Sequence, residues 1–135
     1  MIVTTVFKNL LFYWLPLFIY CLLIYIQSSY PSFEHTSQVL FLDKFLHLTA
    51  YAVLGALFFR AYQTLPIGSR HKILILISIL SSSIYGLSDE LHQYFVPYRQ
   101  ADGLDALANM IGSIIGVLLY QFLFRNHTMD ELKIH

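Results

Sequence analysis

The chain has 135 residues, of which 57% are hydrophobic, and its 8 Lys and Arg residues balance 8 Asp and Glu residues to a formal net charge of zero. A chain this apolar and this poor in charge does not have the composition of a soluble domain. The lack of a basic surface also argues against nucleic acid as a partner. We therefore expect an integral membrane protein.

Four apolar blocks are each long enough to cross a bilayer as a helix, which takes about 20 residues. We predict an all-α membrane protein, a bundle of four transmembrane helices in a single domain over residues 1–135. The predicted helices cover about residues 6–26, 43–62, 72–94 and 103–124. Lys8 and the uncharged run 10–26 could instead form a signal peptide, but no small-x-small cleavage site follows, so we expect a retained helix. Pro16 is expected to kink this helix, and residues 27–42 are expected to form a polar loop.

Lysine and arginine residues in the loops predict the orientation of the bundle, because they are enriched on the cytoplasmic side of membranes. One side of the predicted bundle carries most of them: Lys8, Arg60, Arg70, Lys72, Arg125 and Lys133. The other side carries Lys44 and Arg99, each beside acids. We therefore predict a multi-pass protein of the cell membrane with both termini in the cytoplasm. The start of helix two, the end of helix three and the start of helix four then meet at the extracytoplasmic face.

Polar side chains gather at these three helix ends in stripes with helical spacing. The stripes and their neighbours are Asp43, Lys44, His47 and Tyr51 on the second helix, Asp89, Glu90, His92 and Gln93 on the third, and Arg99, Asp102, Asp105 and Asn109 at the fourth. A charge at the centre of a membrane helix costs about 2.5–3.5 kcal/mol, so such a cluster should be paired, hydrated or functional. Helix capping does not explain Asp105 and Asn109, which lie progressively deeper in an apolar run. We predict a polar pocket that opens to the outside.

Each of these residues also has a structural interpretation. Asp102 could cap the fourth helix, Asp105 suits the helix dipole, and Lys44 could extend its ammonium group to the interface. Arg99 could hold a phosphate or carboxylate of a substrate, or it could pair with an aspartate and lock the connection before helix four. The mixed set of carboxylates and imidazoles could bind Zn, Mn or Fe, but its spacing is not diagnostic. The sequence therefore assigns no metal site and no other cofactor.

The run Gly112-Ser113-Ile114-Ile115-Gly116 lies inside an apolar helix, where small residues let another helix approach closely. The partner could be another helix of the same chain, with Gly55 or Gly86 at the contact, or a second copy of the protein. We expect packing within the chain, and self-association through Gly112 and Gly116 is the alternative.

Three patches of sequence give the chain a resemblance to a known family. They are Ser28-Ser29 with Asp43-Lys44-Phe45-Leu46-His47 and Tyr51, the run YGLSDELHQYFVPYR at 85–99, and Ala101-Asp102 with Asp105, Asn109 and Gly112. On these patches the chain resembles the VanZ-like family of small bacterial membrane proteins. Tyr98 departs from the small residue, often glycine, that the family has between the proline and the arginine. The resemblance implies an integral membrane protein whose namesake is associated with low-level resistance to the glycopeptide teicoplanin, and it supplies no established reaction.

The sequence thus predicts a protein that binds or acts on an anionic membrane lipid or a lipid-linked cell-envelope precursor; whether it is an enzyme stays open. Arg99 and Lys44 would hold a phosphate, and the binding site would be completed by Gln93, Asp102, Asp105, Asn109 and Tyr51. The catalytic candidates are His47 and His92, because histidine titrates near neutral pH, together with Asp43, Asp89 and Glu90.

Two other functions fit the same residues. The polar cluster could be a structural network in a non-catalytic protein that works by association with another envelope protein. Proton-coupled transport is the weaker interpretation, because few polar residues lie in the other halves of the helices.

Overall fold

The computed structural model of the protein describes residues 2–30, 37–97, 99 and 101–131. Every regular element in these residues is a helix. The elements are α1 (Ile2–Asn9), η1 (Leu10–Trp14), α2 (Leu15–Ser28), α3 (Ser37–Tyr62), η2 (Pro66–Ser69), α4 (His71–Phe95) and α5 (Gly103–Glu131). Four stretches are long and apolar enough to cross a membrane: Val3–Ser28, Phe41–Tyr62, His71–Phe95 and Gly103–Phe124. The predicted bundle of four transmembrane helices is confirmed.

The helices extend beyond their predicted limits at several ends. The first continues to Ser28 and α3 begins at Ser37, so the predicted polar loop 27–42 is helical at both of its edges. Helix α5 runs to Glu131 through much of the predicted polar tail. Neither proline nor glycine interrupts these extensions, so nothing in the sequence stops the backbone hydrogen bonding where the apolar run ends. Hydropathy marked the membrane spans rather than the helix ends.

Pro16 disturbs the first helix just ahead of itself. A proline ring lacks the N–H that would bond four residues back and collides with the carbonyl group there. The backbone answers with the π-helical turn Leu10–Trp14, and Pro16 then takes a position in the first turn of α2, where a free N–H is not needed. A π turn of this kind is a known way to accommodate local strain in a helix. The predicted disturbance at Pro16 is therefore a widened turn.

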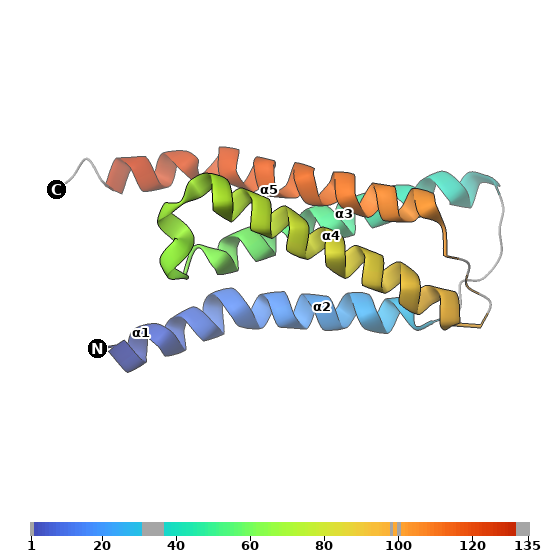
Figure 1. Cartoon of the computed structure of the whole chain (residues 1–135), viewed down its shortest axis with the longest axis horizontal. Coiled ribbons are helices and arrows are strands. Elements are labelled where there is room, and N and C mark those ends of the chain that lie inside the picture. The colour runs from blue at the N-terminus through green and yellow to red at the C-terminus, as the bar shows by residue number, and fades with distance from the viewer. Residues whose placement is uncertain (1, 31–36, 98, 100, 132–135) are drawn as a thin grey trace.

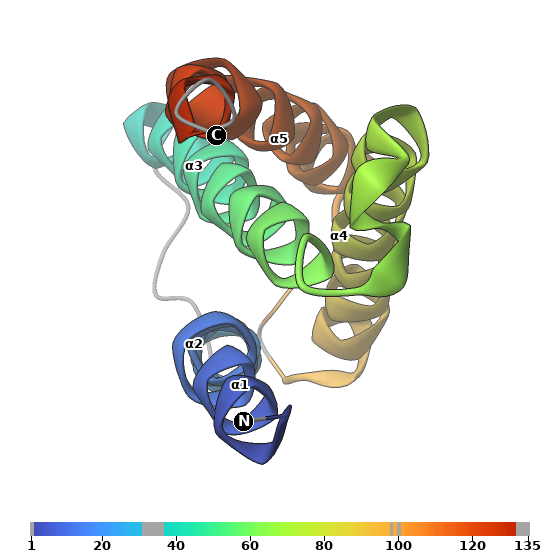
Figure 2. The same ribbon diagram turned by 90° about the vertical axis from the view of Figure 1, so that its left-hand side faces the viewer.

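Helices α3, α4 and α5 pack together, and the first helix lies beside α3 and α4 (Figures 1 and 2). Polar groups fasten the first helix along its length. Trp14 Nε1 donates to Thr64 Oγ1 at 3.0 Å, and Tyr20 OH donates to the Ala50 carbonyl at 3.1 Å. Tyr85 OH on α4 donates to the Cys21 carbonyl at 2.6 Å. Hydrogen bonds between membrane helices contribute about 0.6–2 kcal/mol each, so these contacts fix the position of α2 against the other helices.

Glycines bring α3 and α5 into close contact. A methyl group added to Gly112 would overlap the carbonyl oxygen of Leu48, and one added to Gly116 would overlap that of Ala52. The pair therefore lies against the backbone of α3 in the same chain, as expected for internal packing. Because this face of α5 is occupied by α3, self-association through Gly112 and Gly116 would require α3 to move away.

The surface of the bundle is apolar and its two ends differ. Exposed leucine, isoleucine and phenylalanine side chains cover the helices along the four spans, as expected for surfaces that face lipid. The N-terminal end of α1, the α3–α4 connection and the C-terminal end of α5 lie at one end of the bundle (Figure 1). The C-terminal ends of α2 and α4 and the N-terminal ends of α3 and α5 lie at the other end, which also carries the predicted polar stripes.

Candidate functional site

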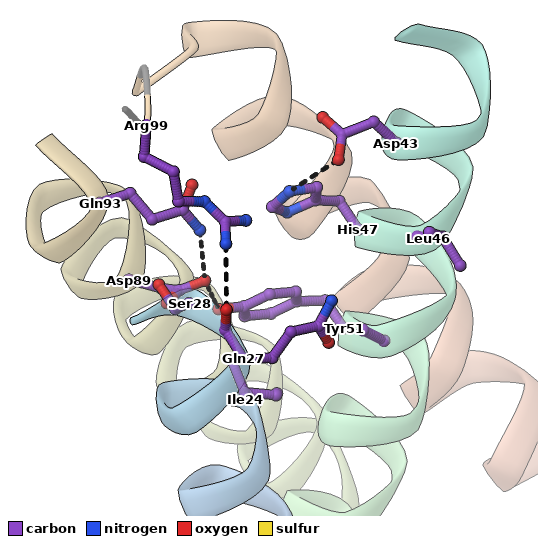
Figure 3. Close-up of a pocket in the computed structure, with 11 residues that line it drawn as sticks. Ile24, Gln27, Ser28, Asp43, Leu46, His47, Tyr51, Asp89, Gln93 and Arg99 are labelled. Carbon is purple, nitrogen blue, oxygen red and sulfur yellow. Dashed lines mark hydrogen bonds and ion pairs between the residues drawn. The ribbon is translucent and has the colours of Figure 1, made fainter. Parts of the chain in front are cut away.

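A pocket opens among the helices at the end where α2 and α4 finish (Figure 3). Its lining combines residues from α2, α3, α4 and the segment before α5: Ile24, Gln27, Ser28, Asp43, Leu46, His47, Ala50, Tyr51, Asp89, Gln93 and Arg99. The bundle thus brings together polar side chains that lie far apart in the sequence.

The predicted site residues fall into three groups by position. Asp43, His47, Tyr51, Asp89, Gln93 and Arg99 line the pocket. Lys44, Glu90, Asp102, Asp105 and Asn109 lie behind this lining, linked to His47 or to one another. His92 lies apart from both groups.

Asp89 is held at the floor of the pocket. Its Oδ2 accepts hydrogen bonds from Tyr51 OH at 3.1 Å and from Gln93 Nε2 at 3.2 Å (Figure 3). All three side chains are buried. Burying a carboxylate is costly unless it is hydrogen-bonded, and these two donors offset that cost. Asp89 and Gln93 are one turn apart on α4, so the predicted shared face is the one that meets Tyr51.

His47 is connected to α5 and α4 through an amide. Asn109 Nδ2 approaches Glu90 Oε1 at 3.4 Å, and Asn109 Oδ1 lies 3.0 Å from His47 Nδ1. A carboxylate only accepts hydrogen bonds, so the amide nitrogen faces Glu90 and the amide oxygen faces the imidazole. The proton of the imidazole is therefore on Nδ1. Asn109 is 1% exposed, which places this relay inside the bundle rather than in the pocket lining.

Lys44 points away from the pocket toward α5. Its Nζ donates to Asp102 Oδ2 at 2.7 Å and forms a closer ion pair with Asp105 Oδ1. Asp102 also accepts the backbone N–H of Leu104 at 2.9 Å, so it caps α5 as one interpretation of the sequence proposed. The Lys44 ammonium, followed by this N–H, holds the pKa of the Asp102 carboxyl below its ordinary value. Two carboxylates already neutralise Lys44, which leaves it outside the phosphate contact predicted for it.

A row of buried hydroxyl groups continues from Asn109 toward the other end of the bundle. Ser113 Oγ donates to the Asn109 carbonyl at 2.8 Å and bonds to Ser82 Oγ at 2.7 Å, while Ser78 Oγ donates to the Leu74 carbonyl at 2.7 Å. The interior is therefore more polar along its length than the sequence suggested. The Ser82–Ser113 bond joins α4 to α5, and the other two bonds lie within a single helix.

Arg99 reaches into the pocket from the segment before α5. Its Nη1 donates to the backbone carbonyl of Gln27 at 3.0 Å (Figure 3) and to that of Tyr30 at 3.1 Å. None of the carboxylates in the described residues lies within ion-pair distance of it. The predicted Arg99–Asp pair is therefore not formed among these residues, in which the guanidinium bonds to carbonyl groups instead.

His92 faces the first helix instead of the pocket. Its Nε2 lies 2.9 Å from Ser29 Oγ, and its ring lies 4.7 Å from that of Tyr25, centre to centre. Ser29 Oγ is also 2.8 Å from the Tyr25 carbonyl and donates its one hydrogen there, so it accepts from His92. The structure therefore does not bring His92 to the site predicted for it. The end of helix α4 turns Asp89 and Gln93 inward, and His92, three residues after Asp89, falls at the edge of that face.

The end of the first helix supplies two pocket residues that the sequence reasoning assigned to a loop. Gln27 and Ser28 line the pocket because α2 continues to Ser28. Ser28 is 3% exposed, and its Oγ has no hydrogen-bond partner among the described residues. The signal was available, since Ser28 belongs to one of the three patches that carried the resemblance. Polar residues directly after an apolar span can thus belong to the helix and to the pocket, and they do not always mark the end of the helix.

One mixed group of the described residues could hold a metal ion. Asp43, His47 and Asp105 each offer one ligand atom, and these atoms lie within 4.8 Å of one another. His47 Nε2 is 3.9 Å from Asp43 Oδ1 and 3.9 Å from Asp105 Oδ2. The spacing in sequence did not reveal this group, because Asp105 comes from a different helix.

Comparison with known proteins identifies the family. The sequence pattern of the family described as VanZ/LLP1 matches residues 2–125 of the chain. The chain belongs to the VanZ/LLP1 family. It is also similar to an uncharacterised protein of the fission yeast Schizosaccharomyces pombe, with 27% identity over 120 residues that cover 89% of this chain and 69% of that protein. No solved structure matches this one.

The three sequence patches that carry the resemblance to the VanZ/LLP1 family lie close together in the structure. The first and second patches form the facing walls of the pocket on α2, α3 and α4, and the third lies behind them at the start of α5. Tyr98, the residue that departs from the family pattern, lies outside the described residues. The residues behind the resemblance are thus largely those that build the pocket and its support.

Proposed function

We propose that this VanZ/LLP1 protein binds the phosphate-bearing headgroup of an anionic membrane lipid or a lipid-linked envelope precursor in the pocket, from the extracytoplasmic side. The observation that carries the proposal is the guanidinium of Arg99 at the pocket, which has no carboxylate partner among the described residues (Figure 3). A guanidinium has five N–H donors, and hydrogen bonds to the Gln27 and Tyr30 carbonyls use two of them. The remaining donors suit the paired oxygens of a phosphate.

The end of α2, to which Arg99 is bonded, offers a second donor in the same pocket. Ser28 Oγ is buried and has no hydrogen-bond partner among the described residues, although such a group normally has one. A ligand oxygen that contacts Arg99 and Ser28 together would satisfy both. Gln93 and Tyr51 hold Asp89 in place beneath them and keep the floor of the pocket polar.

The depth of the pocket favours a lipid as the source of the phosphate. The pocket lies where α2 and α4 end, which is the level of the headgroups if the spans cross a bilayer. Exposed tyrosines Tyr25, Tyr30 and Tyr94 lie near this level, as interfacial aromatic residues do. The similarity to a yeast protein favours a headgroup that bacterial and fungal membranes share over one confined to bacterial envelopes. On this basis a link to teicoplanin would be indirect, through envelope lipids.

The alternative function, a structural network with association to another envelope protein, explains part of the polar set. It accounts for Lys44, which is ion-paired with Asp102 and Asp105, and for the Asn109–Glu90 contact. It does not account for Arg99 and Ser28, which have no acidic partner and no hydrogen-bond partner for the hydroxyl, respectively, among the described residues. Because the described residues offer no acidic partner with which to exchange the charge of Arg99, binding must be measured directly.

Lipid binding by the purified protein tests the proposal. We expect protein in detergent to retain phosphatidic acid over phosphatidylcholine by about tenfold or more, since a charge-assisted contact contributes about 1.5–3 kcal/mol. Native mass spectrometry of bound lipids would measure the ratio. Inorganic phosphate added as a competitor separates recognition of the phosphate alone from recognition of the whole lipid. Equal retention of the two lipids would refute the proposal.

The orientation can be tested with single cysteines. The chain has one cysteine, and Cys21→Ala removes it. In that background Ala101→Cys lies exposed near the pocket and Gln63→Cys lies exposed at the other end. The basic residues at the second end predict that a membrane-impermeant maleimide labels the first variant in intact cells and the second only after permeabilisation. The reverse pattern would place the pocket on the cytoplasmic side.

A further inference from the structure

The imidazole of His47 lies between two carboxylates from different helices. Its Nδ1 is 3.0 Å from the amide oxygen of Asn109, so Nε2 is the ring nitrogen that faces the carboxylates. Asp43 Oδ1 and Asp105 Oδ2 each lie 3.9 Å from Nε2, which is too far for a hydrogen bond. The His47 side chain is 10% exposed. His47 therefore faces two carboxylates without a hydrogen bond to either, and one ligand atom from each of the three side chains lies within 4.8 Å of the other two.

The surroundings of His47 carry more negative than positive charge. Five acids lie in or behind the pocket: Asp43, Asp89, Glu90, Asp102 and Asp105. The cations nearby are Lys44, shared between Asp102 and one oxygen of Asp105, and Arg99, bonded to carbonyl groups. Carboxylates so close to one another repel, and the phosphate of the proposed ligand would add to the repulsion. A further cation would reduce the repulsion among the carboxylates and their repulsion of the phosphate.

We infer that Asp43, His47 and Asp105 bind a divalent transition-metal ion of the Zn²⁺ or Mn²⁺ class. Imidazole and carboxylate ligands together suit such ions. Bonds of about 2.0–2.2 Å place the ligand atoms of a tetrahedral site roughly 3.4 Å apart. The present separations of 3.9 Å from Nε2 approach that value and close by small rotations of the two aspartates.

The remaining neighbours orient the three ligands. Lys44 holds Oδ1 of Asp105 and leaves Oδ2 for the metal, and Asn109 fixes the tautomer of His47. Partners of this kind, which hold a ligand in position through its other atoms, are a regular feature of metal sites. His47 then acts as a ligand, and this role replaces the proton transfer expected from the sequence.

The metal site adds a second positive charge to the proposed phosphate pocket, and this consequence alone rests on the proposed function. Asp43 and His47 line the pocket across from Arg99 (Figure 3). A metal on that side and the guanidinium on the other would hold a phosphate between two positive charges. Metal binding itself needs no lipid, so the two parts can fail separately.

Metal binding is tested first with Zn²⁺ alone. The full-length protein is stripped with a chelator, exchanged into discs of phosphatidylcholine, and titrated in competition with a chromophoric Zn²⁺ indicator. We expect one Zn²⁺ per chain, and Asp43→Asn should weaken binding by about tenfold or more. Because the Asp43 side chain is 42% exposed and is not part of the core, this variant should fold. His47→Gln is the second variant, with a thermal unfolding curve to establish that it is folded.

Matched controls separate a site from a general attraction of cations. Asp102→Asn removes the same charge from a side chain that is also 42% exposed and lies on Lys44, outside the proposed ligand set. His92→Gln removes an imidazole that faces the first helix. Both should leave Zn²⁺ affinity within about threefold of the parent, a free-energy change of about 0.7 kcal/mol. No stoichiometric Zn²⁺ in the parent, or an equal loss in Asp102→Asn and Asp43→Asn, would overturn the inference.

Phosphatidic acid then separates the two proposals. If both hold, Zn²⁺ strengthens retention of this lipid in the parent and in Asp102→Asn, and has no such effect in Asp43→Asn. Zn²⁺ binding without any preference for phosphatidic acid would refute the proposed function and support the metal site. A preference for phosphatidic acid without Zn²⁺ binding would support the proposed function and refute the metal site.

Discussion

Replacing Gly116 by alanine should destabilise the bundle by about 1–3 kcal/mol, the cost of forcing an extra carbon into a packed interior. The added methyl group would overlap the carbonyl oxygen, carbonyl carbon and Cα of Ala52, all backbone atoms of α3. Backbone cannot rotate away as a side chain can, so α3 and α5 must separate. The gain of about 1 kcal/mol that alanine brings to an open helix position is smaller than this cost. The free energy of unfolding, from titration of the protein with a denaturing detergent, measures the loss.

The same substitution elsewhere in the chain provides the controls. Gly103→Ala adds the same methyl group where no atom lies within 4 Å, so stability should stay constant or rise. Gly55→Ala should fall between the two, because its added carbon would lie 2.7 Å from the carbonyl oxygen of Ser113. If Gly116→Ala proved as stable as Gly103→Ala, the close approach of α3 and α5 would be wrong.

The fold could be predicted from the sequence because a bilayer allows few solutions. Long apolar runs must form helices in lipid, where every backbone N–H and C=O needs a partner within the segment. Apolar length therefore located all four spans. It could not locate the helix ends, since α3 begins at Ser37 and α2 continues to Ser28 through residues that are polar but readily helical. Hydropathy predicts which residues lie in lipid, whereas the ends of a helix depend on capping and on tertiary contacts.

The site could be predicted in part, because periodicity places residues on a face but does not say which neighbour the face meets. Asp89 and Gln93 share a face of α4, and both reached the pocket as expected. His92 lies at the edge of that stripe and meets Tyr25 and Ser29 of the first helix instead. Lys44 follows Asp43 directly, yet only Asp43 lines the pocket, while the Lys44 ammonium lies 4.0 Å from Asp43 and closer to Asp102. These outcomes depend on the rotation of each helix, which packing decides.

The pairing of charges was the least predictable feature. Lys44 and Arg99 looked equivalent in sequence, since each lies close to acids. In the structure Lys44 is neutralised by Asp102 and Asp105, while Arg99 binds only carbonyl groups among the described residues. The difference arises because α5 brings its first turn to Lys44, and the segment before α5 carries Arg99 toward the end of α2. The phosphate contact expected from two cations is therefore proposed for Arg99 alone.

Replacing Arg99 by glutamine should abolish most of the preference for phosphatidic acid. We expect a loss of about tenfold or more in relative retention, because a charged hydrogen bond to a phosphate contributes about 1.5–3 kcal/mol. Arg99→Lys should recover only part of it, since an ammonium keeps the charge but lacks the planar fork that reaches the Gln27 and Tyr30 carbonyls and the ligand together. Retention of the two lipids by each variant, measured by native mass spectrometry, gives the ratio.

Arg60→Gln is the matched control, because it removes one arginine from the opposite end of α3, where Arg60 lies over the ring of Tyr13 at 5.0 Å. The net charge of the chain changes by the same amount, so a general electrostatic attraction to anionic lipid would weaken equally in both variants. Thermal unfolding of Arg99→Gln should shift only slightly, because its two lost hydrogen bonds lie at the exposed end of the bundle. A folded Arg99→Gln variant that kept its full preference would show that Arg99 does not hold the phosphate. It would then favour the structural network as the role of the polar cluster.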